Sequence, residues 1–203
     1  MVHSPQYIWI SHEHPDHFNT ENLLKIEEDK RPTILFQKTN DQKVKHWCEG
    51  HNFKIKELEP YKRYNLKEGG DIMCGVVGGF DSFLHFKTKD YSILNLNDCQ
   101  IYDKKELEEL RKKVGPIDYL FTQFGYANWA GNESDNELPK KAKKLVFDTL
   151  RSQIEILQPI FVVPFASFVY FSHEENFHWN KNSVKIKEVF LLCFTIVPVP
   201  LLL

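Results

Sequence analysis

The chain has 203 residues, of which 42% are hydrophobic and 27% charged, so it can build one sizeable core, and a second full domain is not expected. A formal net charge of −2 excludes an overall positive field for binding nucleic acid. The four cysteines are far apart and the chain starts with no signal-peptide pattern, which favours reduced thiols in a cytoplasmic protein.

The first expected strand, residues 6–11, leads directly into the densest group of potential metal ligands in the chain. Residues 12–17 read His-Glu-His-Pro-Asp-His, which places three imidazoles and two carboxylates within six residues. Imidazole suits Zn, Fe and Mn, and an added carboxylate lets two metals share one short loop. Side chains two positions apart in an extended segment project to the same side, so His12, His14 and Asp16 could converge. The alternative, a polar loop after an edge strand, explains isolated histidines better than three so close together.

Helix and strand alternate in the next part of the chain. A helix is expected over residues 20–28, with Asn19 or Thr20 as its N-cap. A strand at 33–36, a short helix at 41–49 that ends at Gly50, and an alternating strand at 53–58 follow. This order is a βαβ rhythm and indicates an α/β fold.

Antiparallel pairing is expected in the middle of the chain. Residues 61–67, a turn at 68–71 and a strand from Ile72 read as one antiparallel pair. Residues 82–87 and 91–96 read as a second hairpin, and the last of these strands leads into Asp98. An aspartate at the end of an apolar strand is the second place where a metal ligand is expected.

The remaining chain predicts two more helices and two more strands. Asp103 caps a helix that runs to about Lys113, a buried strand occupies 117–123, the longest helix covers 139–157, and a strand follows at 160–164. Residues 124–132 combine aromatic rings with amides, as either a substrate wall or a surface loop. Residues 189–203 are predicted to be a core strand that ends in a truncated tail, because this apolar run is shorter than the roughly 20 residues that span a bilayer.

The His-x-His-x-Asp-His pattern at a strand end resembles that of the metallo-β-lactamase fold hydrolases. The resemblance implies an αββα sandwich, here apparently without N-terminal strands and with a truncated C-terminus, in a single partial domain over residues 1–203. Residues 93–99, 118–131 and 157–173 are similar to the branch that contains the non-Rieske domain of CMP-N-acetylneuraminate hydroxylase and related lactonase or phosphodiesterase-like enzymes.

The resemblance also implies a set of metal ligands. His12 and His14 match the first metal position, Asp16 and His17 the second, Asp98 the bridging carboxylate, and His173 the last histidine of the second position. The family's remaining histidine is missing, because residues 75–80 read Gly-Val-Val-Gly-Gly-Phe. One tightly held ion (Zn²⁺, or Fe²⁺ or Mn²⁺) and a weak or empty second position are therefore expected. His85 is expected to be a core or strand-face residue rather than a replacement ligand.

The family's chemistry implies hydrolysis of an ester, lactone, amide or phosphodiester by a metal-bound hydroxide, with Asp16 and Asp98 as catalytic carboxylates. The expected pocket wall consists of Tyr126, Asn128, Trp129 and Tyr170. The alternative is a degenerate or partner-dependent domain that works with a separate Rieske protein, since this chain has no Cys-x-His Rieske pattern. The expected partners are a small-molecule substrate, neither nucleic acid nor membrane, and a second copy of the chain if a sheet edge is left unpaired.

Overall fold

The computed structural model describes residues 5–67, 69–125, 131–135, 137–165, 167 and 169–196. The chain divides into two compact units, Met1–Thr88 and Lys89–Leu203. Each unit is described by itself below. That residues 1–203 form one domain remains a prediction.

The first unit contains a parallel sheet with strand order β1-β2-β3. Its strands are β1 (Tyr7–Ile10), β2 (Thr33–Gln37) and β3 (Ile55–Leu58). The connections carry α1 (Thr20–Leu24), the 3-10 helix η1 (Glu28–Lys30) and α2 (Lys43–Gly50). Parallel neighbours need such crossovers, so the predicted βαβ rhythm is confirmed.

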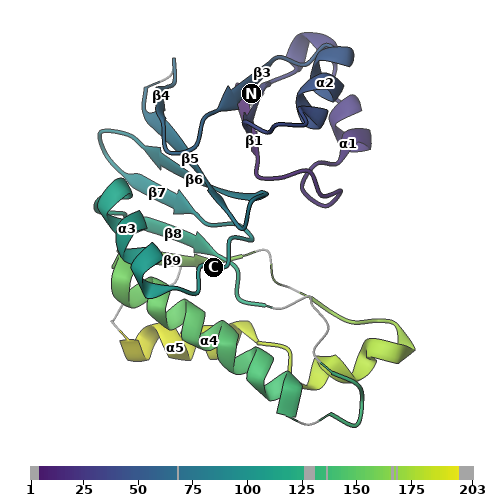
Figure 1. Cartoon of the computed structure of the whole chain (residues 1–203), viewed down its shortest axis with the longest axis vertical. Helices are drawn as coiled ribbons and strands as arrows, with labels where there is room; N and C mark the ends of the chain where they lie inside the picture. Colours follow the sequence, from purple (N-terminus) through teal and green to yellow (C-terminus); the bar gives the residue numbers. More distant parts are fainter. Residues whose placement is uncertain are drawn as a thin grey trace. The chain divides into compact units, whose positions relative to one another are not determined.

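Both faces of this parallel sheet are covered. Ile34 and Phe36 of β2 are buried on the face that carries α1 and α2, which lie on the same side of the strands in Figure 1. Leu35, between them, points to the other face and packs against Ile72 and Cys74 of the next sheet. Alternate side chains of a strand point to opposite faces, so β2 reads as an almost continuous apolar run.

The second sheet of this unit is antiparallel and has the order β4-β5-β6. Its strands are β4 (Arg63–Asn65), β5 (Asp71–Val77) and β6 (Asp81–Lys87). The predicted pairing of residues 61–67 with the strand from Ile72 is confirmed by β4 and β5. The pairing of β5 with β6 was not predicted. Their turn uses Gly78 and Gly79 at φ values of 64° and 91°, which glycine adopts without steric cost.

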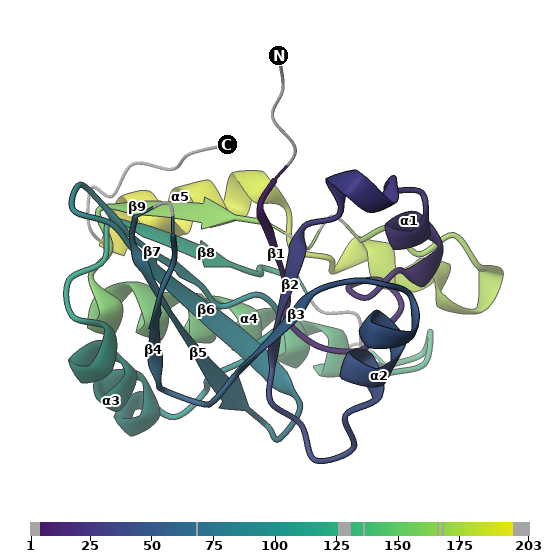
Figure 2. The same cartoon turned by 90° about the horizontal axis from the view of Figure 1, so that it is seen from above.

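The second unit contains three parallel strands, which run side by side in Figure 2. They are β7 (Ser92–Asn95), β8 (Tyr119–Thr122) and β9 (Phe161–Pro164). Its helices are α3 (Lys104–Val114), α4 (Glu137–Leu157), the 3-10 helix η2 (Glu174–Lys181) and α5 (Ile186–Ile196). The predicted cap is present, since Asp103 accepts hydrogen bonds from the backbone N–H groups of Lys105 and Glu106.

The C-terminal segment differs from its prediction. The strand expected from residue 189 is wrong, because α5 is a helix up to Ile196. Val189, Leu192 and Cys193 are buried in a cluster with Leu150 and Ile154 of α4, and this spacing of three and four residues suits a helix face. Within the described part of the chain, no helix combines the length and hydropathy that a membrane crossing requires.

Candidate metal centre

The loop of residues 11–17 is anchored where it leaves β1. The Ser11 carbonyl accepts hydrogen bonds from Gln37 Nε2 at 3.2 Å and from Ser82 Oγ at 2.5 Å. Gln37 is only 3% exposed and also donates to the carbonyl of Phe80. A buried amide with two carbonyl partners is costly to displace, so β2 and β6 together fix the start of the loop.

The loop then folds back on itself. The His14 carbonyl accepts hydrogen bonds from the backbone N–H groups of His17 at 2.9 Å and Phe18 at 2.7 Å. This turn brings the His17 ring to 4.2 Å from the His12 ring, measured between centroids, while the His14 ring lies 4.5 Å from His12. Three imidazoles that are close in sequence therefore also share one site in space.

Two imidazole nitrogens point at each other. Nε2 of His12 and Nδ1 of His14 are 2.9 Å apart. Metal–nitrogen bonds of about 2.0–2.1 Å at octahedral to tetrahedral angles separate two nitrogen ligands of one ion by about 2.8–3.4 Å. The pair is therefore close to the spacing that a shared ion requires, and these residues fit a metal of the Zn, Fe or Mn type.

The other ring nitrogen of His12 faces oxygen atoms. Its Nδ1 lies 3.0 Å from Ser11 Oγ and 3.6 Å from an Asp81 carboxylate oxygen. The His12 side chain is 2% exposed, whereas Asp81 retains some solvent access. His12 is thus held from one side by oxygens and presents Nε2 on the other.

Asp16 and His17 form the more open part of the loop. Nε2 of His17 is 3.3 Å from an Asp16 carboxylate oxygen, and Nδ1 of His17 is 3.5 Å from Ser11 Oγ. The Asp16 side chain is 76% exposed and the His17 side chain 19%. Asp16 can therefore reach a ligand or solvent molecule without breaking a buried contact.

The second unit holds the other two predicted ligands. Asp98 lies in a turn directly after β7, where the Cys99 N–H donates to the Leu96 carbonyl, and Gln123 Nε2 donates to the Asp98 carbonyl at 3.0 Å. The Asp98 side chain is half-buried. His173 is exposed and precedes η2 as its N-cap residue, without a side-chain capping bond. Asp98 thus follows an apolar strand, as the sequence predicts, whereas His173 stands just before a 3-10 helix.

Comparison with known proteins identifies the fold. Neither the protein-family models nor the curated proteins match this sequence. Among solved structures, CmlA, a diiron β-hydroxylase from Streptomyces venezuelae, superposes with a TM-score of 0.72 at 13% identity, over 97% of this chain and 42% of its own. The metallo-β-lactamase fold protein YhfI from Bacillus subtilis superposes with a TM-score of 0.65 at 10% identity, over 97% of this chain and 73% of its own. This chain has the metallo-β-lactamase fold.

The predicted α/β class and fold family are thus confirmed, while the low identities show the fold alone. Igni18, a metallo hydrolase from Ignicoccus hospitalis, is similar to a lesser degree, with a TM-score of 0.53 at 11% identity, over 79% of this chain and 63% of its own. The chain spans less than half the length of CmlA. The structures that resemble this chain therefore include both a metallo hydrolase and a diiron hydroxylase.

The predicted substrate residues of this metallo-β-lactamase fold protein are only partly visible. Tyr126, Asn128 and Trp129 lie outside the described residues. Tyr170 is 69% exposed, and its ring meets the ring of Phe177 edge-on at 6.0 Å between centroids. Its role as part of a pocket wall stays a prediction.

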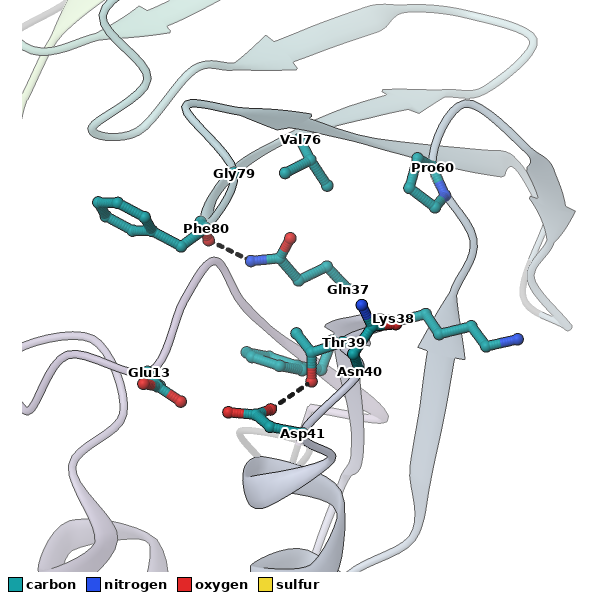
Figure 3. Close-up of a pocket in the computed structure, with 11 residues that line it drawn as sticks. Glu13, Gln37, Lys38, Thr39, Asn40, Asp41, Pro60, Val76, Gly79 and Phe80 are labelled. Atoms are coloured by element: carbon teal, nitrogen blue, oxygen red, sulfur yellow. Dashed lines mark hydrogen bonds between the residues drawn. The ribbon is translucent and has the colours of Figure 1, made fainter.

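A cavity of about 460 Å³ lies beside the loop in the first unit. Its walls are formed by Glu13 of the loop, the segment that follows β2, Pro60, and the turn between β5 and β6. Figure 3 shows Gln37 reaching across it to the Phe80 carbonyl, and Thr39 hydrogen-bonded to Asp41. Sequence reasoning missed Gln37, although a polar residue that ends an apolar strand was an available signal.

His85 is a core residue of β6, as the sequence indicated. It is 0% exposed, and its Nδ1 lies 3.4 Å from an Arg63 nitrogen. Burial, together with the positive charges of Arg63 and Lys87 and against an opposing effect of Asp71, lowers the pKa of the imidazole from 6.5 to about 4. His85 is therefore neutral near pH 7.

Proposed function

We propose that this chain is a metal-dependent hydrolase that acts on an ester, lactone or phosphodiester bond of a small-molecule substrate. The observation that carries the proposal is the convergence of His12 Nε2 and His14 Nδ1 at 2.9 Å in a loop that β2 and β6 hold in place. The fold likeness to Igni18, a metallo hydrolase, supports the same class. Zn²⁺, Fe²⁺ or Mn²⁺ suits such ligands, as one or two ions.

The proposed ligands are those that the sequence resemblance assigns. The first unit supplies His12, His14, Asp16 and His17, and the second unit supplies Asp98 and His173. Residues 75–80, where the family carries a further histidine, contain none. One tightly bound ion and a weaker second position are therefore proposed.

The proposed chemistry depends on the carboxylates of the site. An ion held there would lower the pKa of a coordinated water to about 7 and polarise the substrate's oxygen. Asp16, which is exposed and has His17 beside it, is proposed to orient the attacking water and accept its proton, together with Asp98. Tyr126, Asn128, Trp129 and Tyr170 are the proposed contacts for the rest of the substrate.

A second candidate function is a partner-dependent or degenerate domain. The likeness to CmlA, whose name describes a diiron β-hydroxylase, and the missing histidine favour it. Oxygenase chemistry would then require electrons from a separate Rieske-type protein. Such a domain would bind metal but would not hydrolyse esters, lactones or phosphodiesters alone.

The proposal places the protein in the cytoplasm, without nucleic acid or membrane as partner. Its support is that all four cysteines are buried thiols, as expected in a reducing compartment. A homodimer is proposed as well. Size-exclusion chromatography that shows only monomer would contradict the dimer.

Elemental analysis of the purified protein tests the function. About one Zn or Fe per chain is expected in the wild type, with loss of the ion in His14→Ala, Asp98→Ala and His173→Ala. His46→Ala, on the exposed surface of α2, is the matched control and should keep its metal. Metal-loaded protein should then hydrolyse nitrophenyl esters, lactones or bis-nitrophenyl phosphate. A wild type without metal would overturn the proposal, and metal without hydrolysis would favour the partner-dependent domain.

A further inference from the structure

His12 Nδ1 lies close to oxygen atoms of other side chains in the first unit. Two oxygen atoms from different parts of the first unit approach it, the hydroxyl of Ser11 at 3.0 Å and the carboxylate of Asp81 at 3.6 Å. Asp81 begins β6, directly after the turn between β5 and β6. Ser82, the next residue, donates to the Ser11 carbonyl at 2.5 Å, so the position of Asp81 beside His12 is tied to the sheet.

These oxygens decide which nitrogen of a neutral His12 carries the proton. An ionised carboxylate can only accept hydrogen bonds, whereas a hydroxyl can donate or accept. A proton on Nδ1 is therefore stabilised by Asp81 and can be shared with Ser11 Oγ, whereas a lone pair there would face the carboxylate's negative charge. With the proton on Nδ1, Nε2 carries the lone pair, and Nε2 is the nitrogen that points at His14 Nδ1.

We propose that Asp81 is a positioning residue that, with Ser11, keeps the proton of His12 on Nδ1 and so leaves Nε2 as the metal-binding nitrogen. This inference rests on the proposed function in one respect, namely that His12 binds a metal ion. Carboxylates that accept the proton of the second ring nitrogen fix the tautomer and orientation of a ligand histidine, and their loss typically weakens metal binding 10–100-fold. Asp81 approaches Nδ1 rather than Nε2, so it is not itself a ligand of the ion that His12 would hold through Nε2.

The tautomer can be measured before any metal is added. In the metal-free wild type at about pH 8, where an ordinary imidazole is neutral, long-range ¹H–¹⁵N correlation spectra should show His12 protonated at Nδ1. The assignment of the His12 ring comes from its loss in His12→Gln. A wild-type His12 protonated at Nε2 would overturn the proposal without the use of any Asp81 variant.

Metal affinity gives the second readout. Competition with a chromophoric chelator for Zn²⁺ should show binding 10–100-fold weaker in Asp81→Asn than in the wild type, with the Nδ1 proton lost from part of the population. Asp81→Glu, which keeps the carboxylate, should recover part of the affinity. Asp29→Asn, an exposed carboxylate of η1, is the matched control and should bind as the wild type does.

The outcomes separate this inference from the proposed function. If the wild type binds no Zn²⁺, the proposed metal-dependent function is refuted. The tautomer measurement would still test whether Asp81 keeps the His12 proton on Nδ1. Wild-type binding with unchanged affinity in a folded Asp81→Asn would overturn the role of Asp81 and leave the metal site standing. Circular dichroism of each variant establishes that it is folded.

Discussion

At the scale of single residues, a buried amide and a partly exposed carboxylate organise the site. The buried amide of Gln37 donates hydrogen bonds to the carbonyls of Ser11 and Phe80. The Asp81 carboxylate lies 3.6 Å from Nδ1 of His12. A buried polar group persists only when it is hydrogen-bonded, because an unpaired one costs about 1–3 kcal/mol. These residues therefore hold the ligand loop in one conformation before any ion is present.

His85 gives the first unit a pH-dependent stability. Its pKa falls from 6.5 in the unfolded chain to about 4 in the folded one, so the unfolded state takes up a proton between these values and the folded state does not. The stability is complete above pH 6.5 and should fall by up to about 3 kcal/mol as the pH drops to 4. Urea unfolding of the metal-free protein between these pH values measures it.

His85→Gln is the variant that isolates this effect. It cannot take up the proton, so its free energy of unfolding should depend less on pH between 6.5 and 4 than that of the wild type. Chelator in every sample removes the contribution of metal binding. Equal pH dependence in the two proteins would show that His85 titrates normally.

At the scale of elements, the β5–β6 hairpin depends on one glycine. Gly75 of β5 lies opposite Phe83 of β6, and a Cβ at Gly75 would come within 2.2 Å of the buried Phe83 ring. The ring has no room to move because Phe83 is 1% exposed. The absence of a side chain thus creates the space that the aromatic ring fills.

Gly75→Ala should therefore destabilise the protein by about 1–3 kcal/mol, through overpacking of the core. Gly50→Ala is the matched control, since Gly50 ends α2 and a Cβ there meets nothing within 4 Å. The control should leave stability unchanged or raise it by up to about 1 kcal/mol, because alanine favours a helix over glycine. Equal effects in the two variants by urea unfolding would refute the packing argument.

At the scale of the whole molecule, the reactivity of the four buried cysteines can be used to measure opening of the folded structure. All four thiols are buried, and burial raises the pKa values of Cys48, Cys74 and Cys193 to about 11. The reactive thiolate is therefore scarce at neutral pH, and reagents have no access to it.

Ellman's reagent should accordingly modify none of the four thiols quickly in the native protein and all four in strong denaturant. The native rate then measures opening of the cores that contain these residues. Fast modification of a thiol in the folded protein, with circular dichroism unchanged, would mean that its cluster is open to solvent.

The sequence by itself determined the features that depend on neighbours along the chain. Caps at Asn19 and Asp103, the alternation of helix and strand, and the histidine loop at the end of β1 all follow from local propensity and spacing. The convergence of His12 and His14 was predicted as well, although the structure achieves it in a loop of bends and turns rather than in an extended segment.

Only the tertiary structure decided which distant residues meet the loop. The β5–β6 pairing places Asp81 beside His12, and the β1–β2 register brings Gln37 to the end of β1, neither of which a local pattern encodes. The helix α5 was missed for the same reason, because its short apolar run suits a strand or a helix until packing against α4 selects the helical face. Local sequence sets which elements can form, and long-range pairing sets which side chains they bring together.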